Sequence, residues 1–75
     1  MSFTVYTRED CRYCSLAKDA LDDHDLPFEE VAITPAIKER FRAEGMNTAP
    51  QIWHGETHIG GYTELAAYLK RMEQA

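Results

Sequence analysis

The feature that most limits the fold of this chain is the position of its cysteines. Cys11 and Cys14, the only two in the sequence, are separated by Arg12 and Tyr13. A disulfide between them would close a very short loop, which the chain-entropy estimate values at about 2 kcal/mol at most. Small secreted domains that depend on disulfides carry about four or more cysteines, spread along the chain. The 75 residues must therefore form a single domain, 1–75, around their own hydrophobic core.

Composition narrows the classes of function. Hydrophobic residues make up 44% and charged residues 28% of the chain, as in ordinary soluble globular proteins. The formal net charge is −5, whereas surfaces that bind nucleic acids or anionic membranes need a basic footprint. No stretch approaches the roughly 20 apolar residues of a membrane span, and residues 1–5 lack the regions of a secretion signal. We expect a cytoplasmic protein with neither a nucleic-acid nor a membrane partner.

The first half of the chain predicts a strand, a helix and a second strand. Residues 3–6 alternate large and small side chains, which is typical of a strand. From residue 12 to about residue 24 the spacing of apolar residues predicts an amphipathic helix. The apolar positions are Leu16, Ala17, Ala20 and Leu21. Residues 28–33 then indicate a second strand.

The second half predicts a helix, a hairpin and a final helix. Thr34-Pro35 is typical of a helix start, with Thr as the N-cap and Pro at the first helical position, and Gly45 ends that helix. Short strands at 51–54 and 57–59 flank a two-residue hairpin turn. A final helix over about 63–72 presents one apolar face. That face is formed by Leu65, Tyr68, Leu69 and Met72.

The resulting order, β-α-β-α-β-β-α, predicts an α/β fold with a four-stranded mixed sheet flanked by three helices. The first β-α-β unit should pair its strands in parallel through a right-handed crossover, and the last two strands should pair antiparallel. Cys11 and Cys14 follow the first strand, where the loop turns into a helix. Function usually gathers at this edge of an open α/β sheet.

A helix start gives the two thiols different properties. Cys11, at the cap or first residue, faces unpaired backbone N–H groups, and these donors and the helix dipole stabilise a thiolate. Arg8 and Arg12 add positive charge, which two neighbouring carboxylates partly offset. We expect a depressed pKa at Cys11. Cys14 lies one turn deeper on the same face, so it should be more buried.

This asymmetry predicts thiol–disulfide exchange. The Cys11 thiolate attacks a disulfide and forms a mixed disulfide, and Cys14 then displaces the product and leaves the two cysteines oxidised. The short spacing makes the second step intramolecular and fast.

A zinc site is the alternative use of the two cysteines. C-x-x-C is half of many zinc sites, and His54 and His58 could supply the other half. Thirty-nine residues separate Cys14 from His54, against about 12 in a zinc finger. The residues around Cys11 also predict a helix start rather than a zinc knuckle. His24, near the end of the first predicted helix, is interpreted as a solvated C-terminal residue.

Three motifs, in family order, resemble those of the glutaredoxins. Y-T-R-E-D-C-R-Y-C-S-L-A-K, residues 6–18, is similar to the dithiol active-site pattern Y-[ST]-K-x-x-C-P-Y-C-x-x-[AT]-K. N-T-A-P-Q-I-W, residues 47–53, is similar to T-V-P-Q-I-F, and H-I-G-G-Y-T-E-L, residues 58–65, to H-I-G-G-x-D-D-L. The resemblance covers nearly the whole chain, and its motifs together are specific.

The resemblance implies a thioredoxin-like fold and a glutathione groove. Pro50 would be cis, and the backbone of Ala49 would pair with the peptide backbone of glutathione beside Cys11. Gly60 and Gly61 would allow close approach of the ligand. The remaining implied contacts are Arg8 and Gln51 to the glycine carboxylate, the N–H groups of Tyr62 and Thr63 to the glutamyl carboxylate, Tyr13 as a wall, and Thr48 in the segment before Pro50. Trp53 stands where the family has a sheet aromatic, and we expect it in the core.

Three positions depart from the family pattern. Arg12 replaces the usual proline between the cysteines, which removes a rigid φ and adds a cation. Ala49 replaces valine, a mild change if only its backbone binds. Thr63 replaces an aspartate that helps recognise the glutamyl end, although Glu64 keeps a carboxylate nearby. Active sites without the proline sometimes hold a bridging [2Fe-2S] cluster between two glutaredoxins, which stays a secondary hypothesis.

The sequence as a whole predicts a small dithiol glutaredoxin that reduces protein disulfides or glutathione mixed disulfides. Glutathione would be its co-substrate, with no tightly bound cofactor and no metal, and we expect a monomer. Its partners would be disulfide-bearing client proteins, of which ribonucleotide reductase is one by family analogy only. The first alternative is an NrdH-type redoxin reduced by thioredoxin reductase. The second is an iron–sulfur or zinc binding module.

Overall fold

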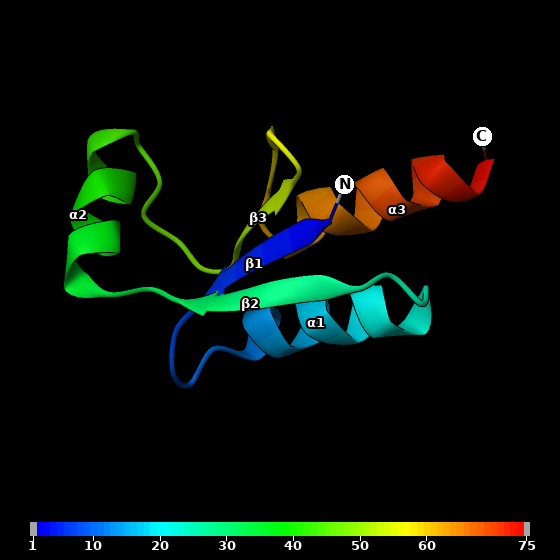
Figure 1. Ribbon diagram of the computed structural model, residues 1–75, viewed down its shortest axis with the longest axis horizontal. Coiled ribbons are helices and arrows are strands. Elements are labelled where there is room, and N and C mark those ends of the chain that lie inside the picture. The colour runs from blue at the N-terminus through cyan, green and yellow to red at the C-terminus, as the bar shows by residue number, and fades with distance from the viewer. Residues whose placement is uncertain (1, 75) are drawn as a thin grey trace.

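The computed structural model describes residues 2–74 and shows a sheet with helices packed against it (Figure 1). The elements are β1 (Phe3–Thr7), α1 (Arg12–Asp23), β2 (Phe28–Ala32), α2 (Pro35–Ala43), β3 (Gln51–His54), β4 (Thr57–Gly60) and α3 (Tyr62–Gln74). The predicted order is therefore confirmed. Over this range, no helix has the length and apolar character needed to cross a membrane.

The four strands form one mixed sheet in the order β2-β1-β3-β4. β1 and β2 pair in parallel, whereas β1 with β3 and β3 with β4 pair antiparallel. The hairpin between β3 and β4 turns at Gly55, which adopts a φ of 62°. This sheet and its three helices confirm the predicted α/β class and its four-stranded mixed sheet.

The core lies on one face of the sheet, beneath α1 and α3. Successive residues of β1 alternate between the two faces, so Phe3, Val5 and Thr7 are buried on the core side. α1 and α3 contact each other above this face. The apolar cluster between the sheet and the two helices consists of Phe3, Val5, Ala17, Leu21, Ile52, Leu65 and Leu69.

The opposite face of the sheet carries aromatic side chains that are only partly covered. Tyr6 of β1 and Trp53 of β3 pack edge to face, with 5.4 Å between ring centroids. Phe41 of α2 lies against both rings. The prediction that Trp53 belongs to the core is wrong: its neighbour Ile52 points into the core, so Trp53 faces the other side and is half-buried.

α2 is the helix least attached to the rest of the fold. None of its residues is buried, and it reaches the sheet mainly through Phe41. Figure 1 shows it standing away from α1 and α3. Its start is the predicted one, because Thr34 Oγ1 accepts a hydrogen bond from the N–H of Ile37 at 3.2 Å and Pro35 occupies the first turn.

Candidate active site

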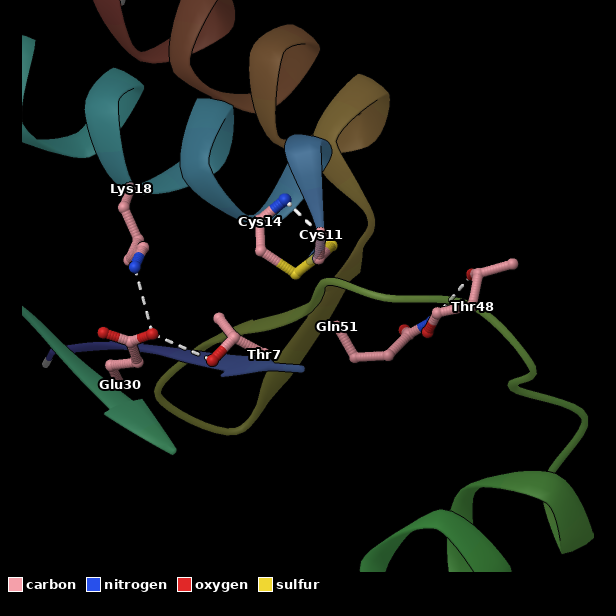
Figure 2. The surroundings of a disulfide bond; sticks show 7 residues. All are labelled: Thr7, Cys11, Cys14, Lys18, Glu30, Thr48 and Gln51. Atoms are coloured by element: carbon pink, nitrogen blue, oxygen red, sulfur yellow. Dashed lines mark hydrogen bonds and ion pairs between the residues drawn. A yellow bond between two sulfur atoms is a disulfide. The ribbon is translucent and has the colours of Figure 1, made fainter. Parts of the chain in front are cut away.

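The two cysteines form a disulfide at the N-terminus of α1 (Figure 2). Cys11 is the N-cap residue, with extended backbone angles of φ −113° and ψ 104°. Its sulfur accepts a hydrogen bond from the N–H of Cys14 at 3.2 Å, so one of the unpaired donors of the helix start points at Cys11 Sγ as predicted. The residue before the cap, Asp10, lies in a turn and has a φ of 53°.

The exposure of the two sulfur-bearing residues differs in the predicted sense. Cys11 is half-buried, whereas Cys14 is 3% exposed. The reason is helical geometry: Cys14, Ala17 and Leu21 follow at spacings of three and four residues, so they share the face of α1 that packs on the sheet. An incoming disulfide can therefore approach Cys11, whereas Cys14 is reached only from Cys11.

A polar network lies between α1 and the sheet, to one side of the disulfide (Figure 2). Lys18 Nζ lies 3.0 Å from Glu30 Oε2, and the hydroxyl of Thr7 donates to the same oxygen at 2.9 Å. The Lys18 ammonium and then the Thr7 hydroxyl hold the pKa of Glu30 below its usual value. Thr7 is 6% exposed, and this bond satisfies its buried hydroxyl at the end of β1.

A groove of about 190 Å³ passes beside the start of α1 and the start of α3. The bond between Ala49 and Pro50 is cis, as predicted, and both residues line the groove. Of the residues that the family resemblance places around the groove, seven line it: Tyr13, Thr48, Ala49, Pro50, Gly61, Tyr62 and Thr63. The rings of Tyr13 and Tyr62 lie 6.0 Å apart between centroids, and Tyr13 is 57% exposed.

Glu64 completes the lining of the groove in a role that the sequence did not reveal. Its carboxylate oxygen accepts a hydrogen bond from the N–H of Gly61 at 2.8 Å, which caps the start of α3. A Cβ on Gly61 would meet this oxygen at 3.3 Å and the carbonyl oxygen of Pro50 at 3.5 Å, so a side chain there would crowd both. The sequence signal for this cap is the three-residue spacing from Gly61 to Glu64, which is that of a capping box. The box is incomplete, because Gly61 stands where a Ser or Thr is usual.

Arg8 and Gln51 lie outside the groove lining. Arg8 is exposed and borders a neighbouring cavity of about 220 Å³, which shares Thr48 and Ala49 with the groove. Gln51 is 5% exposed. Its Nε2 donates hydrogen bonds to two atoms of Thr48, the carbonyl oxygen at 2.9 Å and Oγ1 at 3.2 Å. Its Oε1 lies 2.9 Å from Nε2 of His58. Gln51 thus holds the Thr48 segment in place by hydrogen bonds, and His58 in turn holds the side chain of Gln51.

The zinc site considered from the sequence is not assembled. Nδ1 of His54 lies 2.6 Å from the hydroxyl of Tyr68, and its ring stacks on Phe3 at 4.1 Å. His58 instead lies over Trp53, on the other face of the sheet. Across residues 2–74, no group of three or more His, Cys, Asp or Glu side chains is placed to hold a metal ion.

Known glutaredoxins are similar to this chain in sequence. The glutaredoxin family model matches residues 3–59. A glutaredoxin of Pseudomonas aeruginosa is 42% identical over 66 residues, which cover 84% of this chain and 79% of the relative. A 38% identical glutaredoxin of Neisseria meningitidis covers 83% of this chain and is itself covered to 78%.

Two solved structures are similar to this chain in both fold and sequence. Glutaredoxin 1 of Francisella tularensis, solved as a cacodylate complex, superposes with a TM-score of 0.83 at 31% identity, over 99% of this chain and 98% of its own. The glutaredoxin-like NrdH-redoxin of Escherichia coli superposes with a TM-score of 0.75 at 30% identity, over 85% of this chain and 87% of its own.

Proposed function

The chain belongs to the glutaredoxin family and its Cys11–Cys14 pair makes it a thiol–disulfide oxidoreductase, and we propose that glutathione is its electron donor. Its substrates are protein disulfides and glutathione mixed disulfides. The observation that carries the proposal is the groove beside the start of α1, in which residues of all three family motifs meet. We also infer a cytoplasmic monomer that acts on disulfide-bearing client proteins, with ribonucleotide reductase as a client by family analogy alone.

The reaction follows from the unequal exposure of the cysteines. The Cys11 thiolate attacks one sulfur of the client disulfide, a Cys11–client bond forms, and the other client sulfur leaves as a thiolate that takes up a proton. Cys14, deprotonated, then attacks Cys11 and releases the second client thiol. Two glutathione molecules reduce the resulting Cys11–Cys14 disulfide and leave as one glutathione disulfide. With a glutathione mixed disulfide as substrate, Cys11 alone suffices.

The groove is proposed to hold glutathione along its length. The backbone of Ala49 pairs with the cysteinyl residue of glutathione, and Tyr13 and Tyr62 flank it. The glutamyl carboxylate lies at the start of α3, where the N–H groups of Tyr62 and Thr63 meet it. Glu64 supplies a carboxylate close to the glutamyl ammonium group.

The glycine carboxylate is proposed to lie at the Arg8 end of the groove. Arg8 is exposed and in no ion pair among the residues that the structure describes. Gln51 can contribute only by exchanging a hydrogen bond that it now donates to Thr48. Arg8 is therefore the principal partner in this proposal, and Gln51 acts chiefly by holding Thr48.

The experiment that tests the donor is the reduction of the oxidised protein by glutathione, followed by thiol trapping and by Trp53 fluorescence. We expect fast reduction that saturates with glutathione. Cys11→Ser should abolish turnover of every substrate. Cys14→Ser should keep the reaction with glutathione mixed disulfides, but with protein disulfides it should stop at the Cys11–client mixed disulfide. Ser15→Ala, at an exposed position of α1, is the matched control and should behave as wild type. Negligible reduction by glutathione would contradict the proposal.

The NrdH-type alternative is kept because the E. coli NrdH-redoxin superposes on this chain as reported above. Its discriminating test supplies NADPH and thioredoxin reductase in place of glutathione. Rapid reduction by that enzyme together with slow reduction by glutathione would favour the alternative. The iron–sulfur hypothesis has a separate test, since a cluster would give protein purified without air a brown colour and visible absorbance.

A further inference from the structure

A second cavity adjoins the glutathione groove on the other side of the segment before Pro50. It has a volume of about 220 Å³ and lies between α2 and the ends of β1 and β2. Thr48 and Ala49 line both the groove and the cavity, so the cavity continues the groove on the other side of these two residues. Figure 2 shows Thr48 on the chain that runs from α2 towards the disulfide. A ligand longer than the groove therefore has a path into the cavity.

The cavity combines an apolar floor with a cationic rim. Half-buried Ile33, Phe41 and Met46 form the floor. Arg8, Lys38 and Arg42 lie around it, three of the eight lysines and arginines of a chain whose net charge is −5. The remaining polar lining is neutral: Asn47 and Thr48.

The rim cations are largely available to a ligand. In the described part of the chain, neither Arg8 nor Lys38 takes part in an ion pair. Arg42 lies 3.9 Å from Glu39, but both side chains are more than half exposed, so the attraction is weak. The site is thus locally positive on an acidic protein, and such a site attracts a negatively charged partner.

We propose that this cavity binds the client polypeptide just after the cysteine that Cys11 attacks, taking an apolar side chain on its floor and an acidic side chain at its rim. The inference rests on the proposed function, which sets the direction of the substrate: its glutamyl end lies at α3 and its glycine end at Arg8. Glutathione stops at Arg8, whereas a protein chain continues past Ala49 into the cavity. A small anion would leave the apolar floor exposed to water, so the floor and rim together fit a polypeptide segment.

The chemistry predicts a preference among clients rather than a new reaction. Segments with an apolar residue followed by an acidic one should react faster than segments with a neutral pair, because the rim charges steer and hold them. Since the rim is exposed, salt should weaken the preference: the Debye length falls from about 10 Å at 0.1 M to about 3 Å at 1 M.

The test uses the Cys14→Ser protein and short peptides with both ends blocked. Each peptide carries one cysteine joined in a disulfide to 5-thio-2-nitrobenzoate. The Cys11 thiolate attacks the peptide sulfur, a Cys11–peptide disulfide forms, and the coloured thionitrobenzoate thiolate leaves, so absorbance reports the rate. The peptides contain Cys-Gly-Leu-Asp, Cys-Gly-Leu-Asn or Cys-Gly-Ser-Asp. We expect the Leu-Asp peptide to react about fivefold faster than the Leu-Asn peptide, the size of one exposed charge pair. It should also react faster than the Ser-Asp peptide, because only Leu buries apolar surface on the floor of the cavity.

Charge reversal on α2 identifies the surface. Arg42→Glu should reduce the Leu-Asp to Leu-Asn rate ratio about fivefold, and Lys38→Glu should act in the same direction. Arg40→Glu is the matched control, since Arg40 is also exposed on the same helix turn but does not line the cavity, and it should leave the ratio unchanged. Equal rates for the three peptides, or a ratio that Arg42→Glu and Arg40→Glu alter alike, would overturn the inference.

Failure of the proposed function would give a different experimental result from failure of this inference. Glutathione activated with the same leaving group is run beside N-acetylcysteine amide. If activated glutathione reacts no faster than activated N-acetylcysteine amide, the protein has no glutathione groove, whatever the rate ratios among the peptides. If glutathione shows its advantage and the peptides show no preference, the groove stands and the cavity is not a client site.

Discussion

At the scale of single residues, the site depends on where each side chain falls relative to a helix start. Cys11 caps α1 and stays accessible, whereas Cys14, one turn further, is buried with Ala17. Glu64, in the first turn of α3, instead accepts a hydrogen bond from the N–H of Gly61 before the helix and so brings a carboxylate to the groove. Both effects come from backbone N–H groups that a helix start leaves without an internal partner. A difference of three residues thus separates the accessible cysteine, which we propose attacks, from the buried one, which we propose resolves the mixed disulfide.

A substitution at position 63 tests the glutamyl end of the groove. Thr63→Asp should lower the KM for glutathione about threefold, because an exposed carboxylate beside the glutamyl ammonium adds a weak ion pair. An acidic residue in the first turn of α3 also suits the helix dipole, so the fold should tolerate it. Steady-state kinetics with a glutathione mixed disulfide measures the effect. Thr63→Asn is the control of equal size without the charge, and equal KM values for the two variants would contradict the assignment.

At the scale of elements, α1 and α3 share the core and α2 does not. α1 contributes the fully buried Leu21, whereas the least exposed residues of α2 are the half-buried Ile37 and Phe41. The rings of Phe41, Tyr6 and Trp53 are the main attachment of α2 to the sheet. α2 should therefore be the element that opens first.

Removal of the Phe41 ring tests this attachment. Phe41→Ala should cost about 1–2 kcal/mol of stability, less than the cost at a fully buried site. Its main effect should be local: the backbone amides of α2 should exchange with solvent much faster, whereas those of Val5 and Ile52 should keep most of their protection. Hydrogen exchange followed by NMR measures both, with exposed Arg40→Ala as the control. An equal acceleration at every amide would show that α2 unfolds only together with the core.

At the scale of the whole molecule, one ion pair joins the far ends of two helices. Nε2 of His24, at the C-cap of α1, lies 2.7 Å from Glu73 near the end of α3, and Nδ1 lies 2.8 Å from the carbonyl oxygen of Ala20. The carbonyl of Ala20 and then the carboxylate of Glu73 raise the pKa of His24 above 6.5. The interpretation of His24 as merely solvated missed a partner 49 residues away.

This pair predicts a pH dependence of stability. A raised pKa in the folded state means that the contribution of His24 is fully present below its unfolded value of 6.5 and is lost as the pH rises through the folded value. The stability difference between wild type and His24→Asn should therefore be larger at about pH 5.5 than at about pH 8.5. Urea unfolding at both pH values measures it. Glu73→Gln should reduce the pH dependence, Glu39→Gln should not, and a difference independent of pH would contradict the prediction.

The part of this protein that its sequence determines is local. The order of elements, the helix starts at Cys11 and Thr34 and the position of Cys14 follow from patterns that act over four residues or fewer. The family motifs bring in the groove residues around Pro50 and Gly61. Only the tertiary structure decided which face Trp53 occupies, that His58 supports Gln51, and that three cations gather around one cavity. The physical reason is that strand register and helix packing determine contacts between distant segments, and no spacing along the chain encodes them.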